Sequence, residues 1–201
     1  LNTPVPGGDS NFTQFFNLIS LGGGDIAFNG EGQPGQRGIY TFINGDLAVV
    51  VDENTPIPEG TGNFTSLGSP TRLGDGNIAF LGEGTNSQSG IYADFDGSII
   101  KVADRNTLIP GGTGNFSGQF YAPVSIGDGD MAFIVEDPEQ PGIYAYIDGV
   151  LSVIADRNTA IPGSTDTFAG FGLLSAIGGK DVAFYGWSSD GAGIYSYIDN
   201  V

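Results

Sequence analysis

The sequence contains no cysteine and no histidine, and only 6 of its 201 residues are basic. Without cysteine there are no disulfides, thiolate metal ligands or thiol nucleophiles. Without histidine there is no imidazole to bind a metal or to act as the base of a catalytic triad. The 23 acidic residues set a formal net charge of -17. Such a chain repels a phosphate backbone or an anionic membrane surface, so we expect no nucleic acid among its partners.

Long apolar runs are also missing, and no stretch approaches the length needed to cross a bilayer, so we expect no membrane insertion. The chain begins with Leu1, which favours a processed or excised piece of something longer. Turn formers are abundant instead, with 35 Gly and 11 Pro, while 14 Phe and 8 Tyr argue against disorder. This composition is typical of short strands joined by many turns.

One phrase recurs along the chain at a constant spacing of 52 residues. It reads NTPVPGGDSNF from Asn2, NTPIPEGTGNF from Asn54, NTLIPGGTGNF from Asn106 and NTAIPGSTDTF from Asn158. We therefore predict a single repeat domain over residues 1–201, built of the repeats 2–53, 54–105, 106–157 and a shorter 158–201.

Each repeat contains the same succession of short apolar runs closed by Gly, Asp or Asn. In the second repeat these runs are 64–74, 77–82, 90–97 and 98–104. Gly or Pro interrupts nearly every window with helical periodicity, so we predict four strands per repeat and an all-β chain. The second strand is apolar at three successive positions in all four copies, which predicts that both of its faces are buried.

Four-stranded units of this length are typical of propeller blades. We predict a β-propeller of four four-stranded blades; half of a larger propeller and a β-solenoid are the alternatives. The fourth repeat stops where the others begin their fourth strand, so the last blade is expected to lack its outer strand and to expose an edge. An open edge can pair with another chain, although removal of an outer strand, for example by a protease, is the favoured explanation.

The recurring phrase offers a first set of candidate ligand contacts, namely Asn54, Asn106, Asn158, Asp104 and Asp156. Because all of them repeat with the unit, a role in the connector between blades is the alternative interpretation. Trp187 has no counterpart in the other repeats and lies near a turn, which makes it the first candidate for an exposed contact with a ligand such as a sugar.

An Asp or Asn precedes the second strand in every repeat, at Asp25, Asn77, Asp130 and Asp181. Together with Asp75 and Asp128, the residues Asn77 and Asp130 form the turns GDGN and GDGD, which are candidate calcium sites. Neither turn supplies the alternating oxygen ligands and closing Glu of an EF-hand, and Asp and Gly also suit a strand-linking turn. We predict no cofactor, with calcium as the alternative.

Three glycosylation triplets begin at Asn11, Asn63 and Asn115. A repeated structural corner explains these triplets without a sugar, because Asn favours turns. Catalysis by paired carboxylates would need acids at unrepeated positions, yet Asp52, Asp104 and Asp156 repeat with the unit. The unrepeated run 135–142 is interpreted as a variant loop, so we predict no enzymatic activity.

The combination VADRNTxIPGGTGNF, GxxIAFxGxG and SGIY resembles the repeats of uncharacterised bacterial exported proteins, frequent in cyanobacteria, that often end in a PEP-CTERM sorting tail. The resemblance covers all four repeats and implies a propeller at the cell surface or in extracellular matrix. It implies no catalytic residues.

We therefore expect an extracellular structural or interaction propeller that assembles with other protein chains through its open edge or with itself. A carbohydrate-binding propeller is the second hypothesis, with polysaccharide as the partner. A polysaccharide-acting enzyme is the third.

Overall fold

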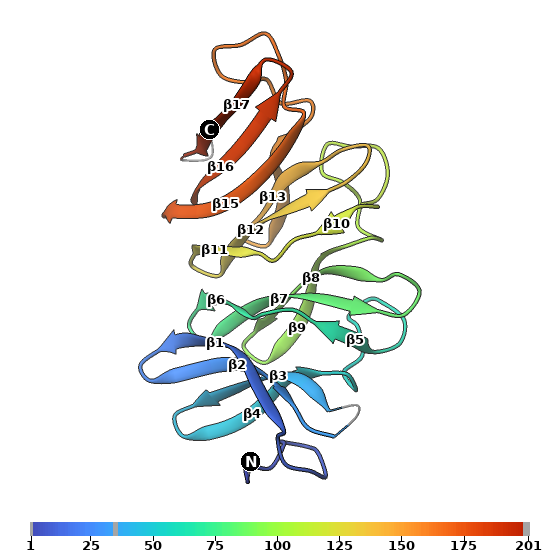
Figure 1. Cartoon of the computed structure of the whole chain (residues 1–201), viewed down its shortest axis with the longest axis vertical. Coiled ribbons are helices and arrows are strands. Elements are labelled where there is room, and N and C mark those ends of the chain that lie inside the picture. Colours follow the sequence, from blue (N-terminus) through green and yellow to red (C-terminus); the bar gives the residue numbers. More distant parts are fainter. Residues whose placement is uncertain (1, 34–35, 199–201) are drawn as a thin grey trace. The chain divides into compact units, whose positions relative to one another are not determined.

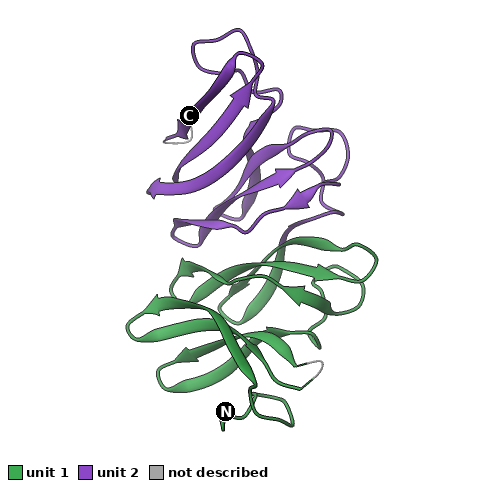
Figure 2. Ribbon diagram, viewed as in Figure 1, with its two compact units in different colours: residues 1–101 green, residues 102–201 purple. Residues whose placement is uncertain are grey.

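The computed structural model describes residues 2–33 and 36–198, and these ranges contain strands and no helix (Figure 1). The prediction of an all-β chain is confirmed. The chain divides into two compact units, residues 1–101 and 102–201 (Figure 2). The strands form four antiparallel sheets, which follow the sequence repeats in order.

The first unit begins with a regular four-stranded sheet in the order β1-β2-β3-β4. Its strands are β1 (Gln14–Gly22), β2 (Asp25–Glu31), β3 (Arg37–Ile43) and β4 (Asp46–Asp52). The second sheet has the order β5-β7-β8-β9, with β6 paired to β7. It consists of β5 (Phe64–Leu67), β6 (Thr71–Gly74), β7 (Asn77–Gly84), β8 (Ser89–Phe95) and β9 (Ser98–Asp104), whose last residues belong to the second unit.

The second unit repeats this plan. The third sheet has the order β10-β12-β13-β14, with β11 paired to β12, and the fourth has the order β15-β16-β17. The third sheet consists of β10 (Gln119–Phe120), β11 (Val124–Gly127), β12 (Asp130–Glu136), β13 (Gly142–Ile147) and β14 (Val150–Asp156). The fourth consists of β15 (Gly170–Gly178), β16 (Asp181–Ser188) and β17 (Gly191–Tyr197), and up to Ile198 no fourth strand joins it.

The first strand of each repeat is less regular than the single run predicted from the sequence. In the second and third sheets it is split into two pieces, and Pro70 and Pro123 lie in the gaps. Proline has no N–H to donate to a ladder, so pairing stops there. In the first and fourth sheets the strand is continuous but bulged, with Asn17 and Leu173 at φ 52° and 46°.

Two-residue turns of one type close the outer hairpins. Asn44-Gly45, Asp96-Gly97 and Asp148-Gly149 all have positive φ at both positions. This is the type I′ turn, whose twist matches that of the flanking strands and which Asn-Gly and Asp-Gly favour. The turn residues of the repeats therefore set the register of the third and fourth strands.

Each sheet has two different faces. The triad face carries two Phe and one Tyr, which are Phe12, Phe28 and Tyr40 in the first sheet, Phe64, Phe80 and Tyr92 in the second, and Phe168, Phe184 and Tyr195 in the fourth. The isoleucine face carries the Ile of the GIY sequence. The first Phe meets the Tyr edge-on with nearly constant geometry, 4.8 Å and 88° in the first sheet and 4.9 Å and 89° in the fourth.

The core of each unit forms where an isoleucine face packs on a triad face. In the first unit Ile39 and Val51 cluster with Phe64 and Phe80 of the second sheet. In the second unit Ile143 and Ala155 cluster with Phe168 and Phe184 of the fourth sheet. In the second sheet the second strand lies in the middle of this packing, and its Ile78, Ala79 and Phe80 are fully buried, as its continuous apolar run predicts. In the first and fourth sheets Ile26 and Ala183 of the same strand are only partly buried.

Candidate functional site

The Asp of each connector forms a closed hydrogen-bonded turn with the Asn and Thr that follow it. In the third connector Oδ1 of Asp156 accepts from the backbone N–H of Asn158 at 2.9 Å and from Oγ1 of Thr159 at 3.0 Å. Oδ2 of Asp156 accepts from the side-chain amide of Asn158 at 3.2 Å. Asp52 and Asp104 make the same bonds with their own Asn and Thr neighbours.

This turn accounts for the recurrence of the connector phrase. Asp104 and Asp156 are buried, and their carboxylates stabilise the turn after the last strand of a sheet. Asn54, Asn106 and Asn158 are exposed, and their amide groups are directed at the Asp carboxylates. A ligand at these positions would therefore compete with bonds that hold the connector.

The Asp or Asn before the second strand holds the outer hairpin of the same sheet. Oδ1 of Asp25 accepts from the backbone N–H of Asn44, and Oδ1 of Asp130 accepts from that of Asp148, both at 2.9 Å. Oδ1 of Asn77 accepts from Asp96 in the same way at 3.0 Å. A side-chain oxygen at this position thus caps the type I′ turn, which explains why both Asp and Asn occur there.

The calcium candidates lie in two separate hairpins. Asp75 and Asn77 are in the β6–β7 turn of the first unit, while Asp128 and Asp130 are in the β11–β12 turn of the second. Nζ of Lys180 lies 3.0 Å from Oδ2 of Asp130, so a cation already neutralises that carboxylate. Within residues 2–33 and 36–198 no three His, Cys, Asp or Glu side chains gather in a metal-binding group. Calcium binding at either turn stays a prediction.

The glycosylation triplets lie on the surface at the start of each first strand. Asn11, Asn63 and Asn115 are exposed, and each forms an isolated bridge with a residue of the preceding connector. The hydroxyl groups two residues later are engaged: Oγ1 of Thr13 donates to the Glu31 carbonyl and Oγ1 of Thr65 to the Glu83 carbonyl. The triplets have a structural role as corners, and their glycosylation stays a prediction.

An anchor that sequence reasoning missed lies in the loop between β12 and β13. Oδ2 of Asp137 accepts from the N–H and Oγ of Ser117 and from the N–H of Gly118, and Oδ1 accepts from the N–H groups of Glu139 and Gln140. Burial alone would raise the pKa of Asp137, but these hydrogen bonds outweigh it and hold the pKa below its usual value. The signal available in the sequence was that this Asp does not repeat, whereas its partners Ser117 and Gly118 lie about twenty residues away in the chain.

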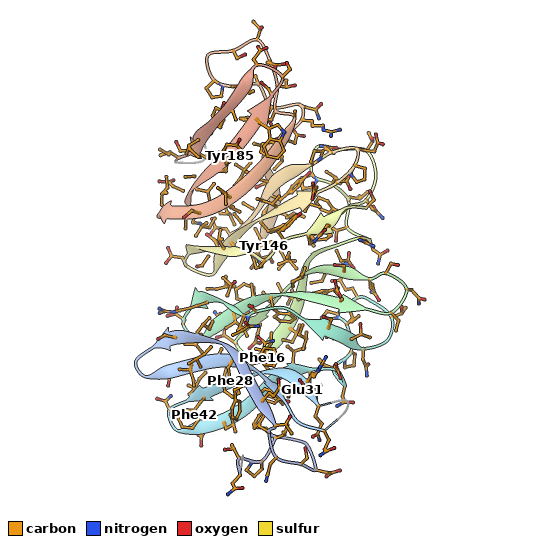
Figure 3. All side chains as sticks on the ribbon, viewed as in Figure 1. Phe16, Phe28, Glu31, Phe42, Tyr146 and Tyr185 are labelled. Carbon is orange, nitrogen blue, oxygen red and sulfur yellow. The ribbon has the colours of Figure 1, made fainter. Side chains whose placement is uncertain are left out.

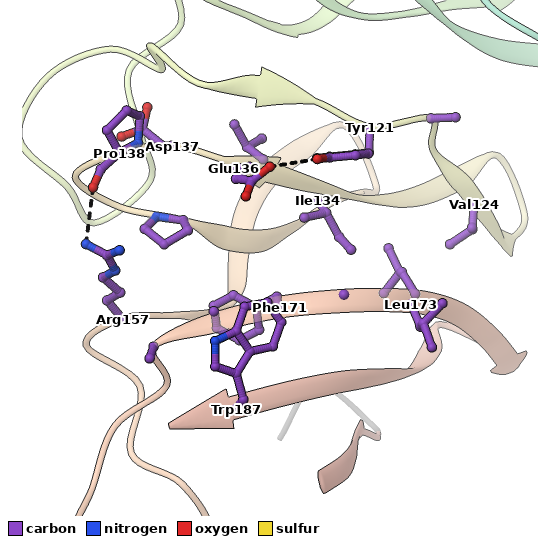
Figure 4. Close-up of a pocket in the computed structure, with 17 residues that line it drawn as sticks. Tyr121, Val124, Ile134, Glu136, Asp137, Pro138, Arg157, Phe171, Leu173 and Trp187 are labelled. Carbon is purple, nitrogen blue, oxygen red and sulfur yellow. Dashed lines mark hydrogen bonds between the residues drawn. The ribbon is translucent and has the colours of Figure 1, made fainter. Parts of the chain in front are cut away.

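A cleft of about 740 Å³ lies between the two sheets of the second unit (Figure 4). Tyr121, Ile134 and Glu136 line it from the third sheet, and Phe171 and Trp187 line it from the fourth. The phenol of Tyr121 donates to Oε2 of Glu136 at 2.7 Å, and Nη1 of Arg157 donates to the Pro138 carbonyl at 3.1 Å (Figure 4). The cleft thus combines aromatic walls with a few fixed polar groups.

Glycine residues of β15 explain the place of Trp187 in this cleft. A Cβ at Gly170 would collide with the Trp187 ring, so the indole lies directly on bare backbone. The ring of Trp187 is 38% exposed and its centroid lies 5.7 Å from that of Tyr185. The structure therefore places the predicted contact residue in a concave site, apart from the connector residues with which sequence analysis grouped it.

The cleft contains two carboxylates, those of Asp137 and Glu136. Asp137 is held ionised by five hydrogen bonds, whereas glycoside cleavage needs one carboxyl group with a raised pKa. Glu136 accepts a hydrogen bond from the phenol of Tyr121, which raises the pKa of that phenol.

A second hollow lies on the triad face of the first sheet. Phe15, Leu18 and Phe42 are exposed there, and with Ile26, Phe28 and Leu47 they line a hollow of about 610 Å³. Figure 3 labels Phe28 and Phe42 on this sheet. Exposed apolar side chains gathered in one hollow are typical of surfaces that contact another molecule.

Comparison with known proteins yields no relative to assign these surfaces. The sequence matches no protein-family profile, and no curated protein is significantly similar to it. The described part of the chain also has no helix that is long and apolar enough to cross a membrane.

Proposed function

We propose that this chain is a non-enzymatic, propeller-type structural or interaction domain of an extracellular surface layer, matrix or filamentous assembly. The observation that carries this proposal is the exposed triad face of the first sheet, where Phe15, Leu18 and Phe42 surround an apolar hollow. An apolar surface of this kind favours protein association over the binding of a polar solute.

The repeated order of strands supports a propeller. Each repeat forms an antiparallel sheet whose strands follow one another in sequence, and within each unit consecutive sheets pack face to face. Propeller blades have these properties, with about four to eight blades in a ring. A larger ring shared with further repeats, or a solenoid of stacked sheets, has the same local packing and is the alternative architecture.

The extracellular location rests on the resemblance to exported repeat proteins, and the acidic composition agrees with a soluble, exposed protein. Fractionation of the producing cells, with antibody labelling of intact cells, tests it. We expect the protein in the surface or matrix fraction and accessible to antibody. Recovery only from the cell interior would contradict the proposal.

A second candidate function, carbohydrate binding, is favoured by the cleft of the second unit. Trp187, Tyr121 and Phe171 provide aromatic surfaces, and Glu136 and Arg157 provide hydrogen-bonding groups at its rim. Aromatic stacking combined with a few charged partners is the usual way to hold a sugar ring.

Calorimetric titration with a panel of soluble oligosaccharides tests this second function. We expect binding that Trp187→Ala reduces at least about tenfold, the loss of about 1.4 kcal/mol that one aromatic contact supplies. Leu108→Ala is the matched control, because Leu108 is exposed on a connector and does not line the cleft. Unchanged binding in the Trp187 variant would reject the cleft as the sugar site.

A further inference from the structure

The Ile of the GIY sequence has opposite environments in different sheets. Ile39 and Ile143 are 0% exposed, because a triad face packs on each of them, whereas Ile194 of the fourth sheet is 71% exposed. We infer that two copies of this chain associate head to tail, with the isoleucine face of the fourth sheet of one copy on the triad face of the first sheet of the next. This inference rests on the proposed role in assembly.

The isoleucine face of the fourth sheet matches the faces that are covered. Ile194 pairs with Tyr185 across β16 and β17, as Ile143 pairs with Ile134 and Ile39 with Asn29 in their sheets. Ala183 in the second strand of this sheet is equivalent to Ala27 in the first sheet and Ala132 in the third. Figure 3 labels Tyr185 on this sheet. The face therefore shares its Ile and Ala with the faces that receive a triad face, with Tyr185 in the place of Ile134 and Asn29.

The triad face of the fourth sheet is covered by the third sheet, whereas the triad face of the first sheet is uncovered. Phe15 packs on Phe28 as Phe171 packs on Phe184, with ring centroids 5.4 Å and 5.9 Å apart. Phe171, however, is 9% exposed against the third sheet, while Phe15 is 45% exposed. The uncovered positions are those that an isoleucine face covers in the second unit.

In both units the contact joins the same two kinds of face, because the isoleucine face of one sheet packs on the triad face of the next. Ile39 and Val51 pack on Phe64 and Phe80 in the first unit, and Ile143 and Ala155 pack on Phe168 and Phe184 in the second. In neither cluster does a triad face meet a triad face. A second copy that continues this packing makes a heterologous contact, which leaves one free face of each kind on every dimer and so permits a ring or a filament.

Charge sets the conditions for this association. Each copy carries a formal net charge of -17, so copies repel one another at low ionic strength, while the proposed contact is apolar. Salt screens the repulsion over a Debye length of about 8 Å at physiological ionic strength and leaves apolar burial intact. Association should therefore increase as salt is added, in contrast to a contact made of ion pairs.

The test uses one variant for each face and is read by sedimentation velocity and light scattering over a range of concentrations. Phe42→Lys blocks the triad face and Ile194→Lys blocks the isoleucine face. We expect the unchanged protein to form dimers and larger species. Each variant alone should stay monomeric, and an equimolar mixture of the two should form a dimer and nothing larger, because only one complementary pair of faces remains.

Leu108→Lys is the matched control, since Leu108 is exposed on a connector and belongs to neither face, and it should associate like the unchanged protein. Circular dichroism checks folding. Leu18→Lys, at another exposed position of the triad face, replaces Phe42→Lys if that variant unfolds.

Two results would overturn the inference. The first is an unchanged protein that stays monomeric at every concentration and salt, as closure within one chain or a need for a different partner would produce. The second is an Ile194→Lys variant that associates like the unchanged protein, as contact between two triad faces would produce. Cell fractionation is independent of both, so the proposed function and this contact can fail separately.

Discussion

The N–H and the hydroxyl of Ser117 both donate to Oδ2 of Asp137, at 2.7 Å and 2.9 Å. Asp137 thereby joins the corner that begins the third sheet to the loop between β12 and β13. The same carboxylate accepts three more backbone N–H groups, so a single side chain orders two segments that border the cleft.

Asp137→Asn should lower the free energy of unfolding by about 2 to 4 kcal/mol, because an amide has one acceptor oxygen and leaves buried N–H groups unpaired. Urea unfolding at pH 7 measures the change. Asp128→Asn is the control, since Asp128 is exposed in a turn and Asn also suits positive φ. Equal stability of the two variants would show that the anchor is dispensable.

The second unit should lose stability as the pH falls below about 4. Although burial opposes the shift, hydrogen bonds hold the pKa values of Asp137 and Asp156 below the unfolded value of about 3.9. The unfolded chain therefore binds more protons in this range, and the stabilisation that is complete above the unfolded pKa is lost as the pH falls through the folded pKa values. Urea unfolding at pH 7, 5 and 3 measures this loss. Asp137→Asn should flatten the profile.

Asp94→Asn should raise the melting temperature at pH 7. Burial raises the pKa of Asp94, and its Oδ1 has no hydrogen-bond partner among the described residues, so ionisation at this position costs free energy. Because the pKa of Asp94 is raised in the folded protein, its contribution to the free energy of unfolding decreases as the pH rises through the folded pKa. The advantage of the Asn variant should therefore shrink in acid. Scanning calorimetry at pH 7 and pH 3.5 tests both statements. A variant that melts earlier at pH 7 would contradict them.

Gly82→Ala should destabilise the first unit by about 1 to 3 kcal/mol, the usual cost of overpacking a core. A Cβ at Gly82 would lie 2.6 Å from Cε1 of Phe64 and 2.8 Å from Cδ2 of Tyr92, so the edge-on contact of the triad must open. Gly172→Ala is the control, because its Cβ would meet its nearest neighbours at an ordinary 3.8 Å. Chemical unfolding of the two variants should differ accordingly.

Lys180→Met should lower the melting temperature, since the buried carboxylate of Asp130 would lose the ammonium group 3.0 Å away. Lys180 also pairs with the exposed Asp148, at 2.6 Å, and Asp148→Asn should have a smaller effect because that carboxylate remains hydrated. Thermal unfolding at low salt compares the two. A larger effect of the Asp148 variant would show that the exposed pair dominates.

Local features of the fold followed from the sequence because they depend on neighbouring residues. Asn44-Gly45 and Asp148-Gly149 specify type I′ turns through their tolerance of positive φ, and the continuous apolar run at Ile78, Ala79 and Phe80 specifies a strand buried on both faces. The break in the first strand could also have been predicted, because Pro70 and Pro123 cannot donate to a strand ladder.

The site residues depended on contacts between segments distant in sequence. Asp137 resembles any loop carboxylate until the fold brings the Ser117 and Gly118 N–H groups to it, and Trp187 lies in a cleft only because Gly170 leaves room for its ring. The exposure of Ile194 was likewise hidden, since its sequence context is the same as that of the buried Ile39 and Ile143. The repeats, the strands and their turns could be predicted from the sequence because they depend on neighbouring residues. Which copies of a repeated face are covered became visible only in the fold, because burial depends on which sheet lies opposite.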